Sequence, residues 1–109
     1  MAQHNLGIIY ANGLGVPQDH AEAVKWYRLA ADQGYASAQN NLGLTYESGL
    51  GVPQDYIAAH IWYNIAGSNG SAKAISNRDR VLAMMQPVDI SEAQRRAKVC
   101  LASNYTDCD

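Results

Sequence analysis

The side chains that could carry out chemistry in this 109-residue sequence are three histidines and two cysteines. His4, His20 and His60 form no i, i+4 pair with an intervening carboxylate, the arrangement that binds zinc in many hydrolases, and neither cysteine has a histidine nearby. The serine motifs Ser-x-x-Lys and Gly-x-Ser-x-Gly are also absent from the sequence. We therefore expect no catalytic centre, no metal site and no bound cofactor.

The cysteines, Cys100 and Cys108, have a spacing that limits any bond between them. On one continuous helix, rising about 1.5 Å per residue, their Cα atoms would lie about 12 Å apart. A disulfide requires roughly 4.4 to 6.8 Å between these atoms. The two cysteines can therefore bond only if the helix ends between them, and Ser103-Asn104 favours such an end. Two free thiols remain the alternative.

The glycine-rich segment 13–15 is similar in composition to a phosphate-binding loop. It lacks the lysine of such loops, however, and is followed directly by Val16-Pro17. We interpret it as a turn. The segment 13–19 recurs unchanged at 49–55, and 19 of 36 positions are identical when 3–38 is aligned with 39–74. The sequence is thus a tandem repeat with a period of 36 residues.

Each period predicts two helices. Apolar residues at three-and-four spacing indicate a first helix over residues 2–12, and Gly13 ends it. The second helix begins near Asp19, where Asp19 and Glu22 have the spacing of a capping box, and Gly34 closes it.

Small residues within these helices indicate close packing. Gly7 lies inside the first helix at a cost of about 1 kcal/mol relative to alanine. Its recurrence as Gly43 suggests that another group contacts the backbone there. One helix pair cannot bury its own apolar face, whereas stacked pairs can. The predicted fold is therefore all-α, an α/α solenoid of stacked antiparallel helix pairs.

We expect one domain over 1–109, since the chain is too short for a second core. It divides into two regular repeats and a degenerate helical cap and tail, at residues 2–37, 38–73 and 74–109. In the last unit we expect a helix over 72–85 and a final helix that begins at Pro87 or at Asp89, where residues 89–92 again have capping-box spacing. Six of the eight basic residues lie within 73–98, which indicates either a polar terminal cap or a basic binding patch.

Composition excludes several classes of function. The net charge is −2 and the basic residues form no stripe interleaved with aromatics, so we expect no nucleic-acid partner. No apolar run approaches the roughly 18 residues that cross a bilayer, so we expect no membrane insertion. The chain enters the first repeat directly, without a cap. We therefore expect an array that continues upstream, where an export signal would lie, and self-association through the uncapped first repeat.

The string Asn-Leu-Gly-x-x-Tyr-x-x-Gly-x-Gly-Val-Pro-Gln-Asp, followed by Ala-x-x-Trp-Tyr-x-x-Ala, resembles the Sel-1-like repeat, a relative of the tetratricopeptide repeat, over residues 2–74. This resemblance implies a non-enzymatic adaptor, in a bacterium, that binds a protein or peptide on the concave face of its helices. Cysteine-rich relatives carry a disulfide at the end of the second helix, which implies a Cys100–Cys108 bond. The same resemblance leaves two alternatives: a β-lactam-binding or hydrolase-like protein, and a regulatory module cut from a larger protein.

A disulfide would place the chain in the bacterial periplasm or outside the cell, and free thiols would place it in the cytoplasm. In stacked helix pairs the first helices line the concave side. An asparagine recurs there in every unit, and its amide can both donate to and accept from a peptide backbone; solvated or capping asparagines are the alternative. The predicted partner-binding residues are Asn5, Ile9, Asn12, Asn41, Thr45, Ser48, Asn77, Val81 and Met84.

Overall fold

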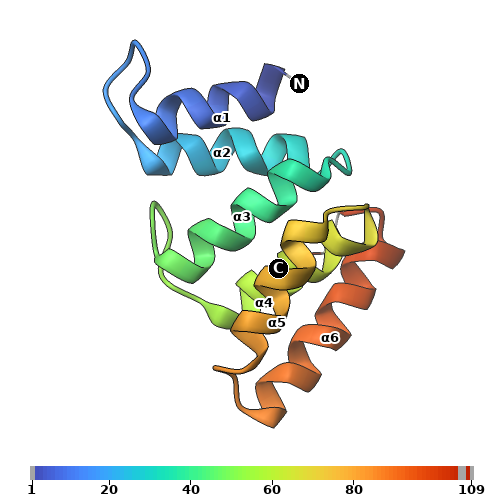
Figure 1. Cartoon of the computed structure of the whole chain (residues 1–109). Helices are drawn as coiled ribbons and strands as arrows, with labels where there is room; N and C mark the ends of the chain where they lie inside the picture. Colours follow the sequence, from blue (N-terminus) through green and yellow to red (C-terminus); the bar gives the residue numbers. More distant parts are fainter. Residues whose placement is uncertain (1, 106–107, 109) are drawn as a thin grey trace.

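A computed structural model describes residues 2–105 and 108, and within them every regular element is an α-helix (Figure 1). Helices α1 to α4 form two antiparallel pairs, α5 packs on α4, and α6 returns to pack on α4 as well. The predicted all-α solenoid is confirmed, with an elongated body of 42 × 26 × 23 Å. The helices are α1 (Ala2–Asn12), α2 (His20–Ala31), α3 (Ala36–Ser48), α4 (Tyr56–Ser68), α5 (Ala72–Leu82) and α6 (Pro87–Ala102).

The second helix of each regular pair begins with an aspartate cap, as the sequence predicts. Asp19 Oδ1 accepts a hydrogen bond from the Glu22 amide at 3.1 Å, and Asp55 caps α4 in the same way. The returning half of the capping box is absent, because the Asp19 amide already donates to the Tyr10 carbonyl at 2.9 Å. Glu22 instead pairs with Lys25. The cap therefore also ties each second helix to the end of the first.

The last two helices begin where the sequence predicts: α5 begins at residue 72, although it ends early, and α6 begins at the first of its two predicted starts. Ser71 caps α5 by accepting from the Ala74 amide at 3.1 Å, and α5 ends at Leu82 rather than at residue 85. Of the two predicted starts for the final helix, Pro87 is correct. Asp89 already lies in the first turn, where its amide donates to the Gln86 carbonyl, so it cannot act as a cap.

The recurring glycines in the first helices allow tyrosine rings to lie against the backbone. A Cβ atom on Gly7 would overlap the ring of Tyr27, and one on Gly43 would overlap the ring of Tyr63. This close approach is the contact that the sequence predicts. It brings the two helices of each pair together more closely than any side chain at these positions would permit.

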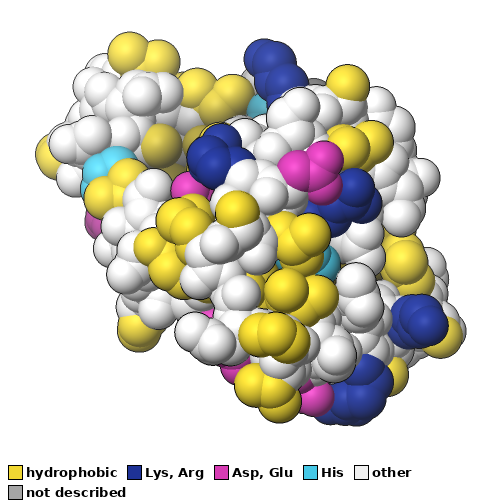
Figure 2. All heavy atoms as spheres, turned by 60° about the horizontal axis from the view of Figure 1, so that its bottom comes forward, with side chains coloured by type: hydrophobic (Ala, Val, Ile, Leu, Met, Phe, Trp, Pro, Cys, Tyr) yellow, Lys and Arg dark blue, Asp and Glu magenta, His cyan; other side chains and the backbone are white. Residues whose placement is uncertain are grey.

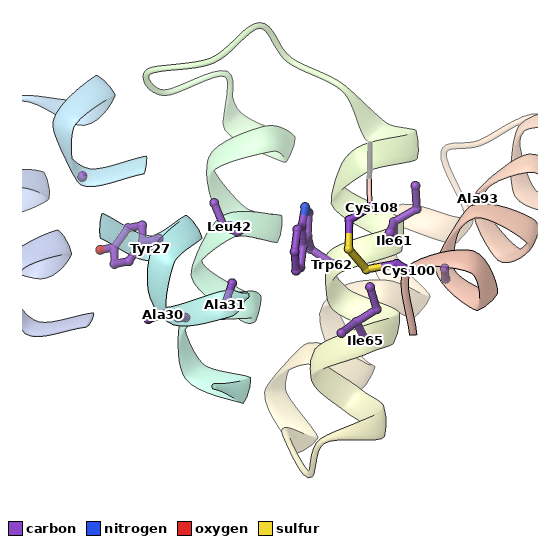
Figure 3. Packing of buried hydrophobic residues seen from close by; sticks show 13 residues of the cluster. Tyr27, Ala30, Ala31, Leu42, Ile61, Trp62, Ile65, Ala93, Cys100 and Cys108 are labelled. Atoms are coloured by element: carbon purple, nitrogen blue, oxygen red, sulfur yellow. A yellow bond between two sulfur atoms is a disulfide. The ribbon is translucent and has the colours of Figure 1, made fainter. Parts of the chain in front are cut away.

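The main core runs along the stack of helices and includes Cys100 and Cys108, which a disulfide joins (Figure 3). Trp62 is 1% exposed and lies between Leu42 of α3 and the disulfide. Arg28 of the preceding helix pair also lies over Trp62, with its guanidinium carbon 5.1 Å from the centre of a Trp62 ring. The equivalent residue of the first repeat, Trp26, is only half-buried. The tryptophan of the repeat is therefore fully buried in the second repeat, where a preceding helix pair packs against it, and only partly buried in the first.

A disulfide joins Cys100 to Cys108 and brings their Cα atoms to 4.3 Å. The helix ends where the sequence predicts, at Ala102, and the chain turns back through Asn104 and Tyr105, both with positive φ. The Tyr105 hydroxyl accepts a hydrogen bond from Asn69 at 2.9 Å. The tail thus returns to the core between α4 and α6.

Candidate functional site

The predicted binding residues of α1, α3 and α5 differ widely in exposure. Asn5, Asn12, Ser48 and Met84 are exposed, Ile9, Asn41 and Asn77 are half-buried, and Thr45 and Val81 are buried. The exposed members still form one series along the three first helices of the stack.

Thr45 and Val81 do not belong to this surface, and the prediction for these two residues is wrong. The Thr45 hydroxyl donates to the Leu42 carbonyl at 2.7 Å within α3. Val81 is 0% exposed and packs in a second core cluster with Tyr63 of α4. The residues that precede them, Leu44 and Arg80, are exposed instead. At the middle position on α3 and α5 the prediction was therefore one residue too late, a rotation of about 100° around the helix, while the first and third predicted positions remain at the surface.

The open surface, which we call the first-helix face, follows the spacing i, i+3, i+7 on α3 and from α5 into the turn that follows it, and the spacing i, i+4, i+7 on α1. It combines amide and hydroxyl groups with exposed apolar side chains, and sequence periodicity alone missed two of its members. Those two are Leu44 and Arg80, whereas on α1 the predicted Ile9 keeps its place because the adjacent Ile8 packs against the main core. The first-helix face comprises Asn5, Ile9, Asn12, Asn41, Leu44, Ser48, Asn77, Arg80 and Met84.

Two of the recurring asparagines join neighbouring first helices. The Asn41 side-chain nitrogen lies 2.9 Å from His4 Nε2, and the Asn77 side chain donates to Asn40 Oδ1 at 3.0 Å. Burial lowers the pKa of His4, so its imidazole is neutral near pH 7 and can accept this hydrogen bond. Both bonds join residues 37 positions apart in the sequence. These asparagines thus set the spacing of the helices that carry the face.

A charged network fixes α3, α4 and α5 beside this face. The Tyr63 hydroxyl donates to Glu47 Oε1 at 2.7 Å, and the Arg80 guanidinium donates to both Glu47 oxygens. Burial raises the pKa of Glu47, but the hydrogen bonds from Arg80 and Tyr63 together lower it by more than burial raises it. The pKa of Glu47 is therefore below its ordinary value. Burial, and then Glu47, raise the pKa of Tyr63. The network therefore holds a carboxylate, a neutral phenol and a guanidinium in fixed positions.

Metal binding and membrane spanning find no support among the described residues. No three histidine, cysteine, aspartate or glutamate side chains in the described ranges come close enough together to share a metal ion. Among the helices of residues 2–105, none has the length and apolar character of a membrane span.

Comparisons with known proteins agree with the repeat architecture. The sequence model of a family described as Sel1 repeat matches residues 1–35 and 36–71. The chain is similar to the crystal structure of a Sel1 repeat protein from Oxalobacter formigenes, with 43% identity and a TM-score of 0.70 over 71% of the chain. It is also similar to a protective antigen of uropathogenic Escherichia coli strains that displays an SLR fold, with 31% identity and a TM-score of 0.89 over 95% of the chain. The matches span 32% and 23% of those two longer chains. A search of curated proteins found no significant match.

Proposed function

Because this chain belongs to the Sel1 repeat family, we propose that it is a non-enzymatic scaffold that binds a protein or peptide on its first-helix face. The observation that carries this proposal is the exposure of Leu44 on α3 and of Met84 in the turn after α5, 37% and 47%. Exposed apolar side chains set among amides and hydroxyls resemble the centre and rim of a protein interface.

The fixed spacing of α1, α3 and α5 supports the same proposal. The hydrogen bonds of Asn41 and Asn77 and the ion pair of Arg80 with Glu47 hold the three helices at set positions before a partner arrives. A surface ordered in advance loses less conformational entropy on binding than a mobile one. We expect a partner to place an apolar side chain against Leu44 and to bond the polar groups around it.

Site-specific photocrosslinking tests this function. A photoreactive phenylalanine derivative replaces Leu44 in one variant and Leu101 in another, since both leucines are exposed on helices, at 37% and 39%. After irradiation in an extract of the source cells, we expect a discrete crosslinked protein or peptide from position 44 and none from position 101. Equal crosslinking from both positions, or none from position 44, would contradict the proposal.

A second interaction is favoured by the N-terminal side of the first repeat, where we propose that a second copy of the chain docks. In the second repeat, a Cβ on Gly51 would overlap the backbone of His20 in the preceding pair, whereas the equivalent Gly15 has no atom within 4 Å. Trp26 is half-buried, and its indole nitrogen is buried without a hydrogen-bond partner. The open space at Gly15 and the partial exposure of Trp26 leave a surface that a further helix pair can cover.

Sedimentation equilibrium over a wide concentration range tests this docking. We expect the chain to self-associate and the substitution Leu14→Lys, at a side chain 58% exposed beside Gly15, to weaken the association. Leu101→Lys, on α6, is the matched control and should leave it unchanged. A chain that stays monomeric throughout, or two variants that behave alike, would exclude this surface.

We further propose that the chain resides in an oxidising compartment, the bacterial periplasm or the exterior of the cell. The disulfide between Cys100 and Cys108 supports this proposal, since disulfides persist in compartments where thiols are not kept reduced. Titration of the unreduced protein, purified from its native compartment, should find no reactive thiol. Two reactive thiols per chain would refute the assignment.

A further inference from the structure

A pocket of about 440 Å³ lies between α5 and α6, with α4 as its floor. Its size is typical of sites that take a small molecule or a few side chains. The residues that line it on α5 point away from the first-helix face. At about 100° per residue, Arg78 and Asp79 lie on the opposite side of α5 from Asn77 and Arg80. The pocket is thus a separate surface, and a ligand bound in it would not touch the first-helix face.

The floor of the pocket carries a buried histidine with unused hydrogen-bonding capacity. His60 is 2% exposed, and no described residue bonds either of its ring nitrogens. Nδ1 in particular is buried without a partner. Burial and then the nearby Arg78 lower the pKa of His60, so the ring is neutral and offers one N–H donor and one acceptor. Buried polar groups are nearly always bonded, which makes this ring an exception among the described residues and the least satisfied polar group beside the pocket.

The walls of the pocket carry an excess of positive charge. Arg78 of α5 donates to Asn64 at 3.3 Å and pairs with Asp79 at 3.1 Å, so these two charges offset each other. Lys98 of α6 lines the opposite wall, and no described residue forms an ion pair with it. Gln94 adds an amide to the same wall. In Figure 2 the lysine and arginine side chains stand in separate groups rather than in one continuous basic patch. The charge at this pocket is therefore local and close to a single unit.

We propose that this pocket binds a carboxylate group. Lys98 supplies the charge, the amide of Gln94 and the outer N–H groups of Arg78 donate to the carboxylate oxygens, and the His60 N–H is the remaining donor. Arg78, Asp79 and Lys98 give the lining a net charge of +1, which a singly charged carboxylate balances and a phosphate dianion exceeds. The group has three possible sources: an acidic side chain of a peptide, a peptide C-terminus, or a free carboxylic acid.

Binding to the intact, oxidised chain tests the proposal and separates the three sources. The probes are a tripeptide capped at both ends with a central glutamate, the same peptide with glutamine, a tripeptide with a free C-terminal carboxylate, and sodium acetate. Titration is followed by the ¹⁵N resonances of the His60 ring and by calorimetry. We expect at least one carboxylate probe to shift the His60 resonances and to raise the pKa of His60. The glutamine peptide should bind about tenfold more weakly than the glutamate peptide, the loss expected when a charged hydrogen bond is removed.

Substitution of Lys98 provides the matched comparison. Lys98→Gln should weaken binding of the effective probe about tenfold, because Lys98 is exposed and its replacement removes a charge without disturbing a core. Lys73→Gln removes the same charge from an exposed site outside the pocket and should have no effect. The proposal is overturned if no carboxylate probe moves the His60 resonances, if the glutamine peptide binds equally well, or if both lysine variants lose affinity alike. Crosslinking from Leu44 should be the same in the Lys98→Gln variant, so failure of either surface can be recognised separately.

Discussion

The substitution Gly43→Ala tests how the helix pairs are held together. Gly43 lies within α3, where a new Cβ would overlap three atoms of the Tyr63 ring. That ring is 0% exposed, and its hydroxyl is fixed by the hydrogen bond to Glu47 at 2.7 Å. The ring therefore cannot move aside without opening the core or breaking this bond.

Two opposing effects set the magnitude. Alanine is favoured over glycine inside a helix by about 1 kcal/mol. Overpacking of a buried site costs about 1 to 3 kcal/mol, and the fixed position of Tyr63 favours the upper end of that range. We therefore expect the free energy of unfolding to fall by about 2 kcal/mol, which lowers the melting temperature of a chain of this size by roughly 10 °C.

Thermal and urea denaturation followed by circular dichroism measures this loss, with Gly67→Ala as the control. Gly67 also lies within a helix, but its Cβ would mainly meet Ile75 Cγ1, which belongs to a side chain that is 40% exposed and packs in neither core cluster of the described residues. Ile75 can rotate away, so this variant should be as stable as the original chain or up to about 1 kcal/mol more stable. In a Tyr63→Ala background, Gly43→Ala should become favourable. A Gly43→Ala chain that is as stable as the original would refute the packing argument.

Two further predictions concern the tail and the charged network. Replacing both Cys100 and Cys108 with alanine should lower the free energy of unfolding by about 2.5 kcal/mol, because the bond closes a loop with a sequence separation of 8 in the unfolded chain; an unchanged urea midpoint would contradict this. The lowered pKa of Glu47 means that its folded form holds its proton less tightly than its unfolded form. Its contribution to stability is complete above its ordinary pKa of 4.5 and is lost as the pH falls through the lower, folded pKa. Unfolding measured from neutral to acidic pH should show this loss, and Glu47→Gln should flatten the acidic part of the profile. An identical profile in the variant would show that Glu47 is not the group that titrates.

The sequence predicted features that depend on a few adjacent residues. The repeat, the Asp19 cap, the turn at Gly13 and the end of α6 before Asn104 all follow from local backbone preferences, and all are present. The direction in which a first helix faces solvent depends instead on its neighbours. Because α3 packs against α2, α4 and α5, only a narrow strip of its surface is exposed to solvent, and Thr45 lies outside that strip, in the buried part of the helix. Helical periodicity cannot resolve a strip so narrow.

The pocket lay beyond sequence reasoning for a related reason. Its walls exist because α5 and α6 both pack on α4 and leave a gap between themselves, an arrangement that the two regular pairs do not share. The sequence nevertheless holds a signal in the comparison of the two repeats. Positions identical in both copies, such as Gly43, serve packing, whereas His60 stands where the first repeat has Val24. A valine would satisfy that buried position without any unpaired polar atom. A histidine there costs stability unless something bonds it, and this cost is the physical reason to seek a ligand at α4 rather than among the positions that the repeats have in common.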